Sequence, residues 1–239
     1  LVVNPLPTPV QPAEYELCDD LASGSDTDEF ASFDLRSRDD EITGGNDDWA
    51  VSYHLTQGDA DAGAPALPDV YQNTVMANQT IFARVENIVT SCFETTTLTL
   101  VVNPLPSPTT IAAVEECDTM ANDGDVDNDG DALFDLTGQV TADIINGETF
   151  MSLTFHETLA SAELGSPSIA TPAAYETVSR TIYVRATDTD PATATQCYRV
   201  IELVLTVQPA PVLPTVIPDL TSCDDNEDGQ ALFDLTQND

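Results

Sequence analysis

An internal repeat of about 100 residues constrains the fold of this chain more than any other sequence feature. The heptapeptide at residues 1–7 recurs unchanged at residues 100–106, and a weaker copy occupies residues 205–211. Three acidic stretches begin with Cys18, Cys117 and Cys223, and each ends in the tripeptide Phe-Asp-Leu. Because about 100 residues is an ordinary size for one domain, the repeat predicts a tandem array of small modules.

The repeat also predicts the domain boundaries. We expect residues 1–10 to be the last strand and linker of a preceding module, and residues 211–239 to be the linker and first loop of a following one. Residues 11–107 and 108–210 are then two complete immunoglobulin-like modules, so the chain is expected to be a segment of a longer array. Eleven of the 16 prolines lie in the three linker stretches. Such stretches favour extended polyproline II, which predicts semi-rigid spacers between modules.

Hydrophobic residues alternate with polar ones inside each module. Trp49, Val51, Tyr53 and Leu55 alternate with Ala50, Ser52 and His54, and the second module repeats the pattern at residues 151–155. A second alternating set covers residues 98–102 and 201–207. This period of two predicts half-buried strands, and the only helix expected lies near residues 139–145. The predicted fold class is all-β, with tandem immunoglobulin-like β-sandwich modules joined by Pro-rich linkers; a small barrel is the alternative.

Charge excludes several classes of partner. With 6 basic and 42 acidic residues, the formal net charge is −36. Nucleic acid and anionic lipid both require basic residues, so neither is expected to bind. No apolar run approaches the roughly 20 residues of a membrane span, so no direct membrane insertion is expected. Nucleophile-elbow, zinc-protease and phosphate-loop motifs are missing, so we predict no enzymatic activity. Glycoside hydrolysis by a pair of carboxylates stays an open alternative in so acidic a chain, although repeated modules offer no unique cleft.

Five cysteines imply disulfides and therefore an oxidising, extracytoplasmic location. We place the start of the last strand at the leading end of a module, where the chain enters. This placement predicts pairing within modules, as Cys18–Cys92 and Cys117–Cys197, with Cys223 paired to a cysteine beyond the segment. A Cys92–Cys117 bridge between modules and free buried thiols are the alternatives.

Two acidic loops resemble calcium-binding loops. Each fits the pattern D-x-[DN]-x-D-G, which supplies alternate oxygen ligands and a glycine for the sharp turn. A backbone carbonyl at the seventh position and an aspartate one residue before the twelfth would complete each set. The predicted calcium ligands are Asp125, Asp127, Asp129, Asp131 and Asp135 in one loop, and Asp224, Asn226, Asp228, Gln230 and Asp234 in the other. The alternative is a solvated acidic turn.

The first copy of this loop lacks the first carboxylate and the glycine, so weaker binding or none is expected at Asp26, Asp28 and Asp34. His54 and His156 occupy one repeat position, as do Arg84 and Arg185. We expect these four residues to be structural features of the module. The arginines should be strand residues paired with acidic neighbours.

The module resembles the tandem repeats of very large Bacteroidota cell-surface adhesins, including the mobile adhesin of gliding motility. The matching features are Cys117 with Asp129-Gly130, the segment 134–137, residues 53–56 and 59–60, residues 182–185, and residues 100–106. The resemblance implies export by the type IX secretion system to the outer surface of a Gram-negative bacterium. Asp118-Thr119-Met120 also resembles the O-glycosylation motif of that phylum, which makes Thr119 a candidate acceptor.

These observations predict a calcium-stiffened, disulfide-closed stalk of a filamentous adhesin that serves surface attachment and gliding. Its expected partners are neighbouring modules of the same chain, with surface polysaccharide or motility-machinery proteins beyond them. Three alternatives stay open: modules that themselves bind glycan or protein, an accessory array of a secreted enzyme, and a self-assembling extracellular filament.

Overall fold

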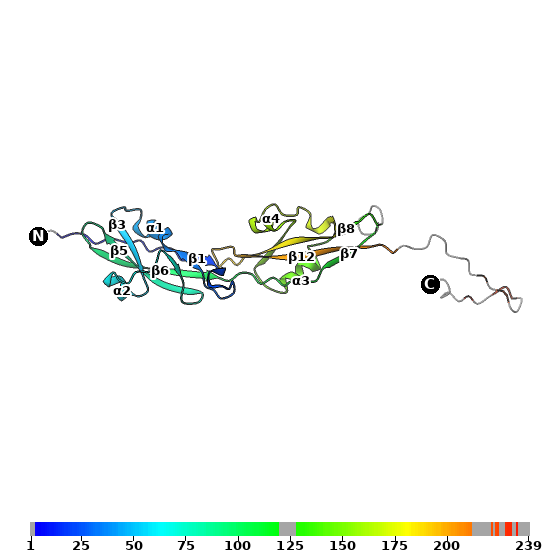
Figure 1. Cartoon of the computed structure of the whole chain (residues 1–239), viewed down its shortest axis with the longest axis horizontal. Coiled ribbons are helices and arrows are strands. Elements are labelled where there is room, and N and C mark those ends of the chain that lie inside the picture. Colours follow the sequence, from blue (N-terminus) through cyan, green and yellow to red (C-terminus); the bar gives the residue numbers. More distant parts are fainter. Residues whose placement is uncertain are drawn as a thin grey trace.

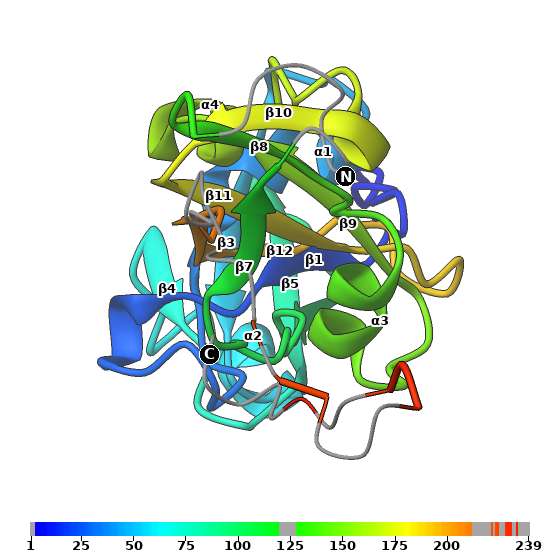
Figure 2. The same cartoon turned by 90° about the vertical axis from the view of Figure 1, so that its right-hand side faces the viewer.

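The computed structural model describes residues 3–119, 128–211, 221, 223–224, 228–230 and 233. They form two β-rich modules that follow one another along the long axis of the molecule (Figure 1). Viewed along that axis, the second module lies in front of the first, so the two are stacked end to end (Figure 2). None of the helices in these residues is long and apolar enough to cross a membrane.

The first module consists of a four-stranded sheet and a two-stranded sheet. The larger sheet has the order β1-β6-β5-β3, and the smaller one pairs β2 with β4. The strands are β1 (Tyr15–Cys18), β2 (Ser32–Asp34), β3 (Trp49–His54), β4 (Val70–Gln72), β5 (Asn78–Asn87) and β6 (Phe93–Asn103). Short helices connect them: η1 (Leu21–Ser23), η2 (Leu35–Arg38), α1 (Asp39–Thr43) and α2 (Gln57–Ala62).

The second module repeats this topology strand for strand. Its larger sheet has the order β7-β12-β11-β9, and its smaller sheet pairs β8 with β10. The strands are β7 (Val114–Asp118), β8 (Asp131–Phe134), β9 (Met151–His156), β10 (Tyr175–Val178), β11 (Arg180–Asp188) and β12 (Tyr198–Pro209). The helices are α3 (Gln139–Ile145), α4 (Leu159–Leu164) and η3 (Pro172–Ala174).

The two sheets of each module enclose its core. Alternating side chains of the long strands point inward, and Leu98, Leu100 and Val102 of β6 are almost completely buried. Leu203 and Leu205 of β12 are likewise almost completely buried in the second module. Phe33 and Phe134, from the repeated Phe-Asp-Leu tripeptide, are fully buried in the two cores. The predicted fold class, tandem all-β immunoglobulin-like modules, is therefore confirmed.

In each module the first strand pairs in parallel with the last strand, so both strands end at the same end of the module. β1 runs parallel to β6, and Cys18 lies opposite Asn103 in the register. β7 pairs with β12 in the same way, which places Cys117 opposite Gln208. The first strand of a module therefore ends beside the point where the chain leaves that module.

One expectation about local structure was wrong. A single helix was predicted at residues 139–145, where α3 lies, but α1, α2 and α4 are also helical. α2 and α4 are single short turns, each capped by a threonine hydroxyl, and their apolar residues are too few to set a helical period.

The Pro-rich stretches, expected to be semi-rigid spacers, also pack against the modules. Val10 donates its backbone N–H to Ile42 O at 2.9 Å, and Thr109 donates to Ile144 O at 2.8 Å. Pro7 and Pro106 are buried. Each linker therefore packs along the module that follows it, and it contributes to the length of that module.

Candidate functional site at the module junction

A disulfide between the two modules is the central feature of the junction. Cys18 at the end of β1 is bonded to Cys197, just before β12, with their Cα atoms 5.5 Å apart. Cys197 is completely buried. Cys92 is free and half-buried, and Cys117 and Cys223 are free and exposed.

The predicted Cys18–Cys92 and Cys117–Cys197 bridges are therefore wrong. Cys92 precedes the first residue of β6, whereas Cys18 lies opposite its last residue, Asn103. Eleven residues of strand separate those ends, a span of about 34 Å at the usual rise. A disulfide needs Cα atoms within about 7 Å. The sequence argument placed Cys18 at the leading end of its module, but the parallel strand β1 carries it to the trailing end.

Arg199 joins the modules beside the disulfide. Its guanidinium pairs with the Asp26 carboxylate at 2.9 Å, and both side chains are about two-thirds buried. It also donates to the carbonyl oxygens of Asp26 and of the linker residue Pro106. One side chain thus contacts the first module, the linker and its own strand, which fixes the position of β12 against the loop after β1.

A second group of polar contacts joins the modules near the bridge. Asn103 donates through its amide nitrogen to Glu16 and to the hydroxyl of Thr195, at 2.8 and 2.7 Å. The same Glu16 carboxylate accepts the backbone N–H of Ala194 at 3.0 Å. Because Asn103 belongs to the repeated heptapeptide, this part of the linker is a contact between modules as well as a connection.

The aspartate after each cysteine closes the acidic loop that follows. Asp19 accepts the backbone N–H of Glu29 at 2.8 Å. Asp118 accepts from Asn128 and Gly130, and Asp224 accepts from Asp228 and Gly229. Glu29, Gly130 and Gly229 all have positive φ angles, of 58°, 108° and 77°. Asp224 was predicted as a calcium ligand, and no role in closing the loop was predicted for Asp19 or Asp118, although their repeated position directly after a cysteine was a visible signal.

Several predicted calcium ligands bind protein donors in the structure. Asp28 accepts from Ser23 and Phe30, and Asp34 accepts from Arg36 N at the start of η2. Asp26 pairs with Arg199. Asp135 caps the turn before α3, where the hydrogen bonds from Thr137 lower the pKa of its carboxyl.

The remaining predicted ligands are only partly described. Asp129 and Asp131 lie at the end of one loop, and Asp224, Asp228 and Gln230 belong to the other. Asp125, Asp127, Asn226 and Asp234 lie outside the described residues. In the described part of the chain, no group of three or more potential metal ligands comes together. Thr119 is half-buried beside Asp118, and Met120 lies outside the described residues.

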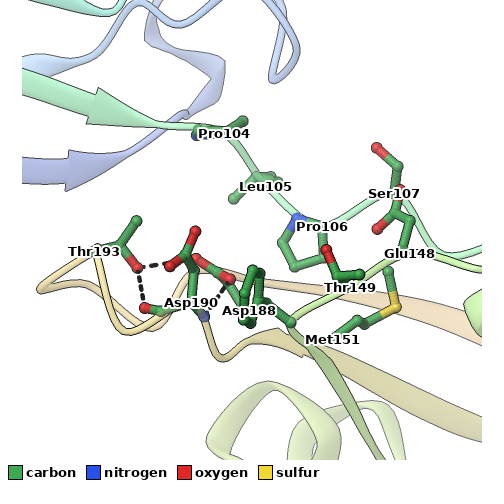
Figure 3. Close-up of a pocket in the computed structure, with 11 residues that line it drawn as sticks. Pro104, Leu105, Pro106, Ser107, Glu148, Thr149, Met151, Asp188, Asp190 and Thr193 are labelled. Carbon is green, nitrogen blue, oxygen red and sulfur yellow. Dashed lines mark hydrogen bonds between the residues drawn. The ribbon is translucent and has the colours of Figure 1, made fainter.

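A cavity of about 410 Å³ lies where the linker passes the β11–β12 loop (Figure 3). Pro104, Leu105 and Pro106 line one side of it, and Asp188 and Asp190 line the other. Their carboxylates accept hydrogen bonds from within the same loop: Asp188 from Asp190 N and Thr193 Oγ1, and Asp190 from Ala192 N. These carboxylates therefore shape the loop that carries Cys197.

The two histidines stabilise equivalent loops. His54 and His156 are completely buried, and each bonds a proline carbonyl oxygen, of Pro65 or Pro167, at 2.7 and 2.8 Å. Their other ring nitrogens contact the hydroxyls of Ser52 and Thr154. The alternation predicted for residues 49–55 fails at its end, because Leu55 is 45% exposed whereas His54 is buried under the loop that bears Pro65.

The two arginines perform equivalent structural roles. Arg84 donates to the carbonyl oxygens of Ala60 and Asp61, and Arg185 donates to those of Ala162 and Glu163, which end α2 and α4. Each guanidinium lies 3.4 Å from the centre of the aromatic ring that follows the late cysteine, Phe93 or Tyr198. Arg84 also pairs with Glu86, as predicted, whereas Arg185 contacts the Thr187 hydroxyl at that place.

The fold and the junction define a class of protein: tandem all-β modules that are covalently joined to one another by a disulfide. The model of the Flavobacterium inter-domain disulphide bond domain matches residues 14–106 and again residues 113–211. The chain belongs to this family. The two matches cover the two modules, and the bond between Cys18 and Cys197 is of the kind that the family description names.

Other comparisons are distant. No curated protein matches the chain. Among solved structures, clustered PcdhgC3 EC1-3 from mouse is 11% identical with a TM-score of 0.19, over 82% of this chain and 64% of that one. Cadherin-like domains 1 to 4 of zebrafish RET are 10% identical with a TM-score of 0.18, over 73% of this chain and 44% of that one. The chain thus spans less than two thirds of either structure.

Proposed function

We propose that this chain is a structural segment of an extracellular stalk, in which each module is bonded covalently to the next. The Cys18–Cys197 bridge carries this proposal. A disulfide inside a module would stabilise that module alone, whereas a disulfide between modules restrains their relative position. Such a restraint is useful where the shape of the array is its function, as it is in a stalk.

Two of the free cysteines, Cys92 and Cys117, extend this proposal to neighbouring modules. Cys92 precedes β6 as Cys197 precedes β12, and Cys117 lies in the first strand of its module as Cys18 does. By this equivalence, Cys92 would bond the first-strand cysteine of a preceding module. Cys117 would bond the late cysteine of a following module. A continuous series of overlapping bridges would then run along the array.

The same reasoning supports an extracellular location and a role in adhesion. Disulfides persist in oxidising compartments, and the family description names a flavobacterial domain. The proposed protein is a cell-surface adhesin exported by the type IX system, without enzymatic activity of its own. Its stalk would hold adhesive parts away from the cell for surface attachment and gliding.

We also retain calcium as a proposed ligand of the second and third acidic loops. Calcium prefers six to eight oxygen ligands, and a D-x-[DN]-x-D-G loop supplies several of them. In the first loop, Asp26 and Asp28 already bind Arg199 and Ser23, so we do not propose calcium there. Calcium bound to the later loops would stabilise their ordered form by mass action.

Surface labelling and binding assays test the proposed function. Antibodies raised against this two-module chain should label intact cells that produce it, because the stalk is exposed at the surface. The isolated chain should bind neither a glycan array nor washed cells, since other parts of the protein carry the adhesive activity. Labelling only after cell lysis would contradict the location, and tight glycan binding would replace the stalk with a binding module.

A further inference from the structure

The bridge connects two segments that together span the whole length of the described structure. β1 ends at Cys18, and β12 begins one residue after Cys197. In Figure 1, β1 runs towards the junction from the first module, and β12 runs from the junction to the far end of the second. The shortest covalent path along the molecule therefore passes through residues 3–18, the disulfide and residues 197–211.

We propose that this path carries mechanical tension, so that an oxidised pair of modules cannot be unfolded by a pull on its ends. The two cysteines are 179 positions apart in the sequence. Everything between them, including most of both cores, forms a closed loop beside the path. This inference goes beyond the proposed function, because it holds for any attachment that loads the two ends.

The path itself can lengthen only slightly under tension. β1 and β12 are already strands, with a rise of about 3.3 Å per residue, whereas a fully stretched chain reaches only about 3.3–3.6 Å. Residues 3–14, which precede β1, contain no helix to unwind, and four of them are proline. Tension therefore reaches the disulfide before it can lengthen the chain appreciably.

Most core residues do not lie on this path, although Leu203 and Leu205 of β12 do. Phe33, Leu98 and Ile182 belong to the closed loop, which is held to the path by hydrogen bonds from β6 to β1 and from β12 to its neighbours. Reduction would change this situation, because force would then pass from Cys18 through the whole loop. The parallel pairing of β1 with β6 would be sheared first.

Single-molecule force spectroscopy on the full chain, with handles attached to both ends, tests this proposal. The oxidised chain should show no unfolding steps below the force that ruptures the handles. After reduction with a phosphine, the same chain should release a contour length of about 600 Å, from 179 positions at about 3.4 Å each. Cys18→Ser should behave like the reduced chain, and Cys92→Ser should behave like the oxidised wild type.

A second handle geometry shows that the oxidised modules remain able to unfold. Handles inserted after the exposed residues Asp47 and Glu148 lie inside the closed loop, so pulling on them should unfold the oxidised chain. Unfolding steps that sum to more than about a tenth of the reduced length, when the oxidised chain is pulled by its ends, would overturn the proposal. So would a reduced chain that lengthens no more than the oxidised one.

Discussion

Arg199 and Asp26 belong to different modules, and their side chains meet at 2.9 Å across the junction. The pair lies beside the Cys18–Cys197 bridge, and Arg199 also donates to the Pro106 carbonyl oxygen. An ion pair in this position holds the two thiols of the reduced protein close to each other. It therefore favours formation of the bridge as well as stabilising the junction.

We predict that Arg199→Gln makes the bridge easier to reduce. A partly exposed ion pair contributes up to about 1 kcal/mol, which corresponds to roughly a fivefold change in the equilibrium with a glutathione buffer. Because salt screens such pairs, the difference between wild type and variant should shrink at 1 M salt. Arg180→Gln, which removes an ion pair within the second module, is the matched control and should leave the equilibrium unchanged. An equal effect of both substitutions would mean that net charge alone is responsible.

Glu29 offers a test of the loop that Asp19 closes. Its φ of 58° lies in the left-handed region, where the equivalent loops have Gly130 and Gly229. Left-handed backbone costs a non-glycine residue about 1–2 kcal/mol, so Glu29→Gly should stabilise the first module by about 1 kcal/mol after the entropy cost of glycine. Glu29→Gln removes the same charge without changing the backbone preference and is the control. Urea denaturation followed by the fluorescence of Trp49, the only tryptophan, measures both variants. If the glutamine variant gained as much stability as the glycine variant, the left-handed backbone of Glu29 would not be the cause.

Tyr53 makes the stability of the first module depend on alkaline pH. Burial raises the pKa of its hydroxyl, and the hydrogen bond that it donates to Asp39 at 2.8 Å raises it further. A tyrosine in the unfolded chain ionises near pH 10, so above that pH the folded state binds more protons than the unfolded state. The contribution of Tyr53 to stability should be constant below about pH 9, and stability should fall by up to about 1.4 kcal/mol per pH unit above pH 10.

The variant Tyr53→Phe should remove this alkaline loss, at the expense of the hydrogen bond to Asp39. Phenylalanine already occupies the equivalent position in the second module, as Phe155, so the change is compatible with the fold. Tyr183→Phe is the control and should keep the wild-type slope. If denaturation curves of the Tyr53 variant lost stability above pH 10 as steeply as the wild type, another group would be responsible.

Calcium is tested by the melting temperature at fixed ionic strength. If the second and third loops bind the ion, calcium at 100 times its dissociation constant should add about 2.7 kcal/mol of stability to the ordered loop, and chelation should reverse the gain. The variant Asp127→Asn with Asp129→Asn should remove the part of the response that comes from the second loop, whereas Asp26→Asn should leave the response unchanged. An unchanged melting temperature on chelation would leave the acidic loops as solvated turns.

The sequence was sufficient to predict the strands and the tandem modules, because both depend on periodicity and repetition. Alternation in residues 98–102 and 201–207 predicted the inward-facing residues of β6 and β12, which the structure confirms. The period of about 100 residues predicted tandem modules of one fold. These signals are local or are repeated in the chain, so they need no knowledge of three-dimensional contacts.

The disulfide could not be predicted in this way, because it depends on a non-local pairing. Nothing in residues 15–18 indicates that this strand runs parallel to β6 and not antiparallel to it. That single choice moves Cys18 from the leading end of its module to the trailing end. The contact of Arg199 with Asp26 depends on the same arrangement, and the sequence offered Asp26 only as a member of a weak or absent calcium site.

The pairing of the cysteines is the central claim, and peptide mapping without reduction tests it most directly. The chain contains no lysine, and cleavage after arginine places Cys18 in residues 1–36, Cys92 and Cys117 together in residues 85–180, and Cys197 in residues 186–199. The structure predicts that residues 1–36 are recovered linked to residues 186–199, with residues 85–180 released free. A product in which residues 85–180 are linked to residues 1–36 would contradict the bond between modules.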